Sequence, residues 1–148
     1  SENGDTLIKA SSQWILIDAA RRRPIALREN LPMYQVIGER VIDTDFPKIS
    51  EPQKIDEAAE FFIRFDDIDL NNHVNNAVYP LWASEAVGID FRAAHTPAEI
   101  EIAFKKEGLY GEDIRVETEF DNLTTIHRIK ATGDGRELAR VRICWIGI

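Results

Sequence analysis

A short polar segment near the middle of the chain holds side-chain types that could do chemistry on an acyl group. Asp69, Asn71 and His73 are spaced two residues apart, so in an extended stretch their side chains share one face. A carboxylate accepts protons, an amide hydrogen-bonds a carbonyl, and an imidazole titrates near neutral pH. These types at this spacing predict a catalytic site, and an Asn-rich turn that only caps a helix fits them equally well.

The residues that follow predict the helix that must position this segment. Residues 76–87 are almost all apolar, and Asn75 or Asn76 can cap the helix start. A helix that is apolar nearly all round is buried rather than laid on a surface. The residues that we expect in the core are Leu81 and Trp82.

Strand patterns flank the expected helix on both sides. Residues 60–66 alternate apolar and polar side chains before it. Three or four strands follow a loop through Pro97, and Gly133-Asp134-Gly135 joins the last two as a hairpin. Their expected ranges are 99–107, 113–121, 124–132 and 136–148. The order of strand, buried helix and antiparallel meander predicts an α+β fold in which a sheet wraps one long central helix.

Composition limits the classes of protein that this chain can belong to. Its 148 residues suffice for one domain or slightly more, and 44% hydrophobic residues can bury a real core. The net charge of −8 argues against nucleic acid as a partner. Cys144 is the single cysteine, which excludes an internal disulfide and fits a reducing compartment.

Neither targeting nor membrane insertion is expected from the sequence. The N-terminus is polar and acidic, unlike a signal or transit peptide. No apolar run approaches the length of a membrane span. A processed or trimmed chain would look the same.

The two ends of the chain repeat one pattern. Residues 4–17 align without gaps on residues 135–148, with Trp14 matching Trp145. If the repeat is real, the chain opens with the last strand of one domain and closes with the last strand of its twin. Most of the first twin is then absent. The expected divisions are a terminal strand in 1–28, a linker in 29–55 and a domain in 56–148.

With this topology beside the Asp-x-Asn-x-His-Val-Asn-Asn string, the chain resembles the acyl-ACP thioesterase family of tandem hotdog domains. The residues that carry the resemblance are 64–76, Tyr79, Trp82, Glu85, 101–107, and upstream 12–18 with 21–24. The upstream group resembles the end of that family's first hotdog, which agrees with the repeat. The resemblance implies that this chain is the C-terminal hotdog, preceded by the last strand of the N-terminal one.

The resemblance also implies the reaction, which is hydrolysis of a fatty acyl thioester on acyl carrier protein. Asp69, Asn71 and His73 fall on the family's catalytic residues, and Glu107 falls on its later acidic residue. Plant members carry a Cys directly after that Glu, where this chain has Gly108. Water is therefore the expected nucleophile, with Glu107 or Asp69 as its base. Asn71 would hydrogen-bond the carbonyl, and His73 would orient the base or protonate the leaving thiolate.

The implied partners are the acyl carrier protein and either a second hotdog domain or a homodimer partner. Carrier protein is strongly acidic, so its binding needs a local basic patch. The candidates are Arg21-Arg22-Arg23 and Lys105-Lys106, with Arg115, Lys130, Arg140 and Arg142 in addition. No cofactor is expected. The expected location is the cytoplasm, or the plastid stroma if the source is a plant.

Other interpretations stay open at this stage. A hotdog hydrolase acting on acyl-CoA fits the same motif, and so does a non-catalytic hotdog that binds an acyl group or a carrier. A metal site is a further alternative, with ligands Asp66, Asp67, Asp69 and His73. A calcium loop fails, because Asn72 replaces the turn glycine and Val78 replaces the bidentate Glu. His95 and His127 have no partner motif and are interpreted as ordinary surface or strand histidines.

Overall fold

The structure, a computed structural model, divides into two units. These are Ser1–Pro47 and Lys48–Ile148. The described residues are 5–18, 20–21, 23–30 and 38–148. Gly4 of the repeat, Arg22 of the basic cluster and residues 31–37 of the expected linker lie outside them.

The first unit contains little regular structure among its described residues. Strand β1 (Ile17–Asp18) pairs antiparallel with β2 (Arg23–Pro24), and a short helix α1 (Leu27–Asn30) follows. Residues 5–16 form no strand despite their alternating pattern. A strand needs a hydrogen-bonded neighbour. The proposed division of the chain into a terminal strand, a linker and a domain stays a prediction.

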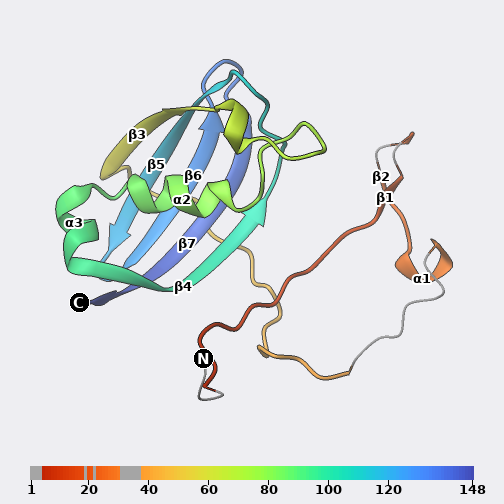
Figure 1. Ribbon diagram of the computed structural model, residues 1–148, viewed down its shortest axis with the longest axis horizontal. Helices are drawn as coiled ribbons and strands as arrows, with labels where there is room; N and C mark the ends of the chain where they lie inside the picture. The colour runs from red at the N-terminus through yellow and green to blue at the C-terminus, as the bar shows by residue number, and fades with distance from the viewer. Residues whose placement is uncertain (1–4, 19, 22, 31–37) are drawn as a thin grey trace. The chain divides into compact units, whose positions relative to one another are not determined.

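The second unit is an antiparallel sheet curved around a helix (Figure 1). Within residues 38–148 the sheet has five strands in the order β3-β5-β6-β7-β4. Their bounds are β3 (Glu57–Phe62), β4 (His95–Phe104), β5 (Asp113–Asp121), β6 (Thr124–Ala131) and β7 (Glu137–Gly147). The strand before the helix and the strand after it thus lie at opposite edges. The expected sheet around a helix is confirmed.

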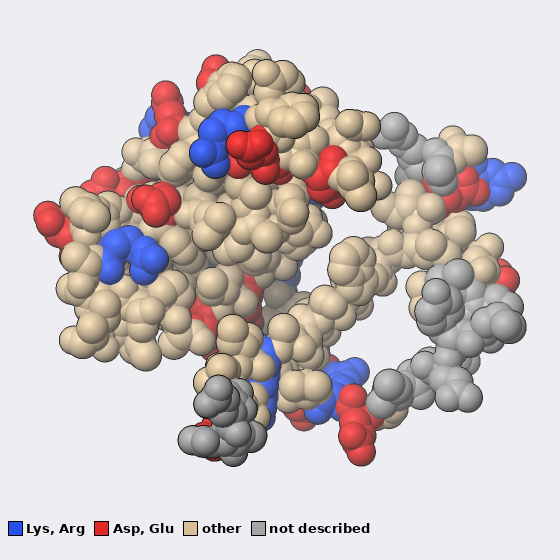
Figure 2. Space-filling model, viewed as in Figure 1, with Lys and Arg blue, Asp and Glu red and all other residues tan. Residues whose placement is uncertain are grey.

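Helix α2 (Val78–Glu85) lies across the sheet and is shorter than the predicted 76–87. It buries Tyr79, Trp82 and Ala83 against Ile114, Val116, Ile129, Val141 and Ile143 of the three central strands. The expectation for Trp82 is correct, but Leu81 is 63% exposed. Leu81 and Glu85 form one i, i+4 row that faces away from the sheet. Figure 2 shows that the outward side of α2 is almost uncharged.

Two local elements differ from the sequence expectation. The first strand ends at Phe62, and a 3-10 turn η1 (Phe65–Asp67) follows, which leaves Phe65 exposed. A second helix α3 (Ile89–Ala94) occupies the expected loop. Strand β4 then begins at His95 and tolerates Pro97, because it is an edge strand with a register shift directly after that proline.

One polar cluster lies inside the core, between the sheet and the helices. His127 is fully buried, with Nδ1 at 2.9 Å from the Thr118 hydroxyl and Nε2 at 2.7 Å from the Thr125 hydroxyl. The Trp145 indole N–H donates to the same Thr125 oxygen at 2.9 Å. Both ring nitrogens thus have partners, so the neutral imidazole is buried without loss of hydrogen bonds. Burial lowers the pKa of His127 to about 3.

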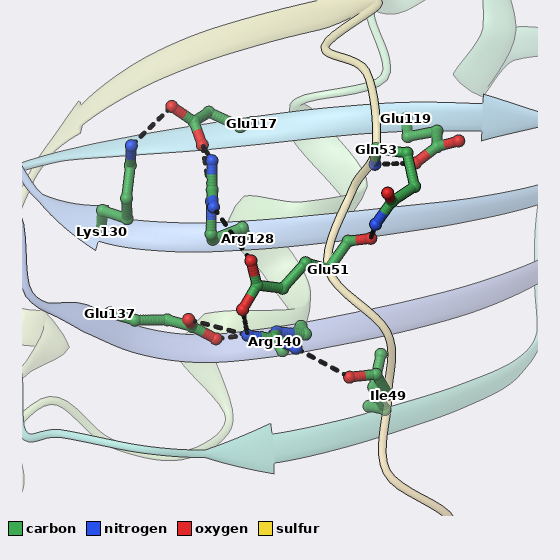
Figure 3. A network of polar contacts seen from close by, with 9 residues as sticks. All are labelled: Ile49, Glu51, Gln53, Glu117, Glu119, Arg128, Lys130, Glu137 and Arg140. Atoms are coloured by element: carbon green, nitrogen blue, oxygen red, sulfur yellow. Dashed lines mark hydrogen bonds and ion pairs between the residues drawn. The ribbon is translucent and has the colours of Figure 1, made fainter.

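Residues 49–53 cross the face of the sheet opposite α2, where ion pairs fasten them (Figure 3). The Arg140 guanidinium is 4% exposed and donates to Glu137 at 2.8 Å, to Glu51 at 2.9 Å and to the Ile49 carbonyl at 2.9 Å. A second centre, Glu117, accepts from Arg128 and Lys130, both at 2.7 Å. Burial raises the pKa of Glu117, but the bonds from Lys130 and Arg128 outweigh it and lower the pKa overall. We call residues 49–53 the strap.

Removing the cation that holds the strap is expected to destabilise the fold. Arg140→Ala leaves the Ile49 carbonyl and the Glu137 carboxylate without their donor, which costs about 2–4 kcal/mol of unfolding free energy. Arg115→Ala is the control on the same face, because its pair with Glu60 is exposed and its 3.8 Å contact with Glu117 is long beside the 2.7 Å bonds from Arg128 and Lys130, so it contributes less than about 1 kcal/mol. Urea unfolding of both variants measures the difference. Equal losses would contradict the assignment.

The buried histidine predicts a specific pH dependence of stability. The unfolded chain binds a proton at His127 near the ordinary histidine pKa of 6.5, and the folded chain does not until about pH 3. The free energy of unfolding therefore falls as the pH is lowered across this window, by up to roughly 1.4 kcal/mol per pH unit from this group. His127→Gln removes that contribution. Urea unfolding at several pH values should give a shallower acid slope for the variant, and parallel slopes would refute the assignment.

Candidate active site

The segment predicted to carry the chemistry is a closed turn and not an extended strand. Ile68 and Val74 form an antiparallel bridge, and the Asp69 N–H donates to the His73 carbonyl at 2.8 Å. Asn72 has a φ of 62°, in the left-handed region that asparagine tolerates better than most residues. The side chains therefore do not share a strand face. The turn brings them together instead.

Asp69 organises this turn through its carboxylate. Its Oδ1 accepts from the Asn71 N–H at 2.8 Å and from the His73 N–H at 3.4 Å, and its Oδ2 accepts from the Asn71 amide at 3.4 Å. The Asn71 N–H is the largest cause that lowers the pKa of Asp69. The carboxylate is thus ionised and already engaged with the backbone, which makes it a weak base.

His73 and Glu107 meet at the other side of the turn. The imidazole Nε2 lies 3.4 Å from Glu107 Oε2, with the two side chains 37% and 61% exposed. Glu107 lies in the connection between β4 and β5. The carbonyl of the next residue, Gly108, accepts from the Val74 N–H at 3.0 Å, and this bond holds the connection against the turn. All four predicted site residues therefore lie in one partly exposed site.

The start of α2 adjoins this site. Asn75 Oδ1 accepts from the Ala77 N–H at 3.0 Å, and the Asn75 carbonyl accepts from the Val78 N–H at 2.9 Å. The N-cap of α2 is Ala77, without a side-chain cap bond, so the predicted cap at Asn75 or Asn76 is wrong, and Asn75 instead stabilises the turn just before the helix. The first backbone N–H groups of a helix carry partial positive charge. A developing oxyanion near the turn would be stabilised there.

An ion pair between Arg64 and Asp67, which the sequence analysis did not identify, supports the start of the turn. Asp67 is 3% exposed and accepts from the Arg64 N–H at 2.8 Å and from the Arg64 guanidinium at 2.9 Å. Burial raises the pKa of Asp67, but the bonds from Arg64 outweigh it and lower the pKa overall. The Asp67 carbonyl accepts from the Asn75 N–H at 2.8 Å. In the sequence, the i, i+3 spacing of the opposite charges of Arg64 and Asp67 could have indicated this pair.

Arg136 is a second residue that the sequence did not single out. It donates to the Glu107 carbonyl at 3.3 Å, to Glu112 Oε1 at 2.6 Å and to Asp134 Oδ2 at 2.9 Å. It therefore ties the hairpin tip to the connection that carries Glu107. Its position just after a glycine turn gave no sign of this role.

The remaining candidates lie elsewhere or are used otherwise. Asp67 is committed to Arg64, and no three His, Cys, Asp or Glu side chains among the described residues gather as a metal would require. Cys144 contacts Arg142 at 3.6 Å and Thr124 at 3.8 Å, and none of the site residues. The His95 ring stacks on Phe91 at 4.2 Å between centroids.

Four of the nine residues predicted for the basic patch, all on strands of the sheet, are paired with carboxylates. Arg115 pairs with Glu60, Lys130 with Glu117, Arg140 with Glu137 and Glu51, and Arg142 with Glu101. Lys105 and Lys106 differ from these. Both side chains are exposed and make no ion pair with any described residue. The backbone N–H groups of both lysines donate to the Leu138 carbonyl. They directly precede Glu107.

Comparison with solved structures identifies the fold. The 12:0-ACP thioesterase from Umbellularia californica matches with a TM-score of 0.73 at 20% identity, over 89% of this chain and 53% of that one. A 1,4-dihydroxy-2-naphthoyl-CoA thioesterase from Synechocystis matches with a TM-score of 0.55 at 14% identity, over 62% of this chain and 81% of that one. The unit Lys48–Ile148 thus has the hotdog fold, as the sequence predicted.

The sequence comparison assigns the chain to one family within this fold. The model of the acyl-ACP thioesterase C-terminal domain matches residues 50–147, and the chain belongs to this family. The palmitoyl-acyl carrier protein thioesterase of Arabidopsis thaliana, a chloroplastic protein, is 26% identical over 96% of this chain. The chain spans only 39% of that relative's length. No helix among the described residues combines the length and apolar character that crossing a membrane requires.

Proposed function

We propose that this protein hydrolyses fatty acyl thioesters of acyl carrier protein and releases the free fatty acid. Membership of the acyl-ACP thioesterase family supports the substrate class. The observation that carries the chemistry is the contact between His73 and Glu107, on a turn in which Asp69 bonds both the Asn71 amide and the His73 N–H. As the relatives are longer than this chain, the activity is proposed for the whole protein.

Glu107 is the base in this proposal. Its carboxylate is exposed enough to meet water and lies 3.4 Å from His73, whereas Asp69 is bound to backbone N–H groups. Glu107 takes a proton from water as the oxygen attacks the thioester carbon. The C–S bond breaks, and the proton that Glu107 took from water passes through the His73 imidazole to the leaving thiolate, which restores both groups.

Asn71 stabilises the charge that develops on the carbonyl oxygen. Its amide donates to Asp69 at 3.4 Å, a long bond that an oxyanion can replace at little cost. The N–H groups at the start of α2 add to this stabilisation. Asp69 acts indirectly in this scheme, because it holds the turn in the shape that presents Asn71 and His73.

Substitution of the proposed base is the direct test of the mechanism. Glu107→Gln keeps the shape and removes the base, so kcat for acyl-ACP should fall by about two to four orders of magnitude. His73→Ala and Asn71→Ala should cause comparable losses. Turnover is measured with the full-length protein. Cys144→Ser is the control and should be nearly neutral, because the thiol contacts no site residue.

Two outcomes would contradict the assignment. A small loss in Glu107→Gln with a large loss in Asp69→Asn would pass the role of base to Asp69. Abolished turnover in Cys144→Ser with intact turnover in His73→Ala would make the whole site wrong.

Lys105 and Lys106 are proposed to contact the acidic carrier. The chain carries a net charge of −8, so an acidic partner needs local cations to approach. These two ammonium groups are unpaired among the described residues and adjoin the proposed base in sequence. The arginines of the sheet are already paired with carboxylates of this chain, so they attract an acidic partner less strongly.

Charge reversal separates carrier binding from chemistry. Lys105→Glu with Lys106→Glu should raise KM for acyl-ACP about tenfold or more, and more strongly at low salt. The kcat should change little. Hydrolysis of an acyl-CoA of the same chain length serves as the reference reaction. If the wild-type protein preferred acyl-CoA, the carrier assignment would fail and the coenzyme A alternative would replace it.

The edge strand β4 and α2 are proposed to meet a second hotdog, either another domain or another copy. Ile100 and Phe104 on β4 and Leu81 on α2 are exposed apolar side chains. An unpaired edge with apolar side chains favours pairing. Action in the plastid stroma, if the source is a plant, or otherwise in the cytoplasm stays a prediction.

A further inference from the structure

Gly108 lies where the two segments of the candidate site meet. Its carbonyl accepts from the Val74 N–H at 3.0 Å. Gly108 is itself buried, and Glu107 precedes it. The connection that carries Glu107 is therefore fixed to the turn at this residue.

The need for glycine here is one of space. The φ of Gly108 is not among the positive values found at other glycines of the chain, so any residue could adopt this backbone. A Cβ on Gly108 would lie 3.0 Å from Val74 Cγ2, 3.2 Å from Ile63 Cδ1 and 3.3 Å from Leu138 Cδ1. All three distances are tighter than ordinary carbon contacts. The three side chains are buried, so none can move into solvent.

Val74 is the neighbour that would transmit the strain. Ile63 and Leu138 meet the Cβ position with terminal methyl groups, which rotate. Val74 is β-branched and stiff at χ1, so its methyl moves chiefly with its backbone. That backbone is bonded to the Gly108 carbonyl and is adjacent to His73. A side chain at position 108 would therefore push His73 away from Glu107.

We propose that Gly108 is a positioning residue, whose missing Cβ lets the Glu107 segment approach the turn closely enough for His73 and Glu107 to act as a pair. The inference rests on the proposed function, since the pair matters only if it is catalytic.

The first test is Gly108→Ala in the full-length protein with acyl-ACP as substrate. We expect kcat to fall about tenfold, because the added Cβ must displace its neighbours and a catalytic pair is sensitive to small displacements. KM should stay within about twofold, because the substrate contacts are not removed. Gly147→Ala is the matched control, since a Cβ at Gly147 meets nothing within 4 Å. It should leave both parameters unchanged.

A second variant distinguishes positioning from general destabilisation. Val74→Ala removes the methyl that the added Cβ at position 108 would meet, and the single Val74→Ala variant serves as its reference. The double variant Val74→Ala/Gly108→Ala should recover kcat to within about threefold of that reference. If activity merely followed stability, the double variant would be slower than either single one, and the proposal would be overturned. Thermal melts of all variants check folding, and the double variant decides if Gly108→Ala does not fold.

The outcomes separate this inference from the proposed function. Full kcat in folded Gly108→Ala overturns the positioning role while the function stands. A wild-type protein inactive on every acyl-ACP refutes the function. A crystal structure of Gly108→Ala then still tests the geometry: an increased separation of His73 Nε2 from Glu107 Oε2 supports the positioning role, and an unchanged 3.4 Å overturns it.

Discussion

The candidate site depends on one backbone hydrogen bond, from the Val74 N–H to the Gly108 carbonyl. The turn that carries Asp69, Asn71 and His73 is closed on itself, and its Asp69 carboxylate is engaged with backbone N–H groups. The proposed base, Glu107, lies on the connection after β4, and this docking places it beside the imidazole. In our proposal the missing side chain at position 108 is what lets the two segments come this close.

The sheet and the helix supply the rigidity that this docking requires. Ile63, Val74 and Leu138 come from the segment after β3, the turn and the start of β7, and all three surround Gly108. Displacement of any one of these elements would widen the gap between His73 and Glu107. A partly exposed pair is thus held by fully buried neighbours, which lets water reach the site while the geometry stays fixed.

The sequence predicted the bounds of a strand well where the alternation of apolar and polar residues meets no competing local interaction. Residues 113–121 alternate, and β5 has those bounds. The alternation of residues 60–66 failed at Phe65, because the local pair of Arg64 and Asp67 competes with the strand and bends the chain into η1. The spacing of Asp69, Asn71 and His73 suggested a shared strand face. Hydrogen bonds from the backbone to the Asp69 carboxylate instead favour a turn, which still gathers the same residues.

The long-range features were not accessible to pattern reasoning. Leu81 was expected inside, because hydropathy alone cannot tell a core row from a row that meets another domain. The buried His127 cluster and the Arg136 contacts join residues whose proximity follows only from strand register. Position 108 is another case in which the sequence does not show the long-range contacts of a residue. A glycine after Glu107 reads as a missing nucleophile in the sequence, whereas its close packing against Val74, Ile63 and Leu138 is visible only in the structure.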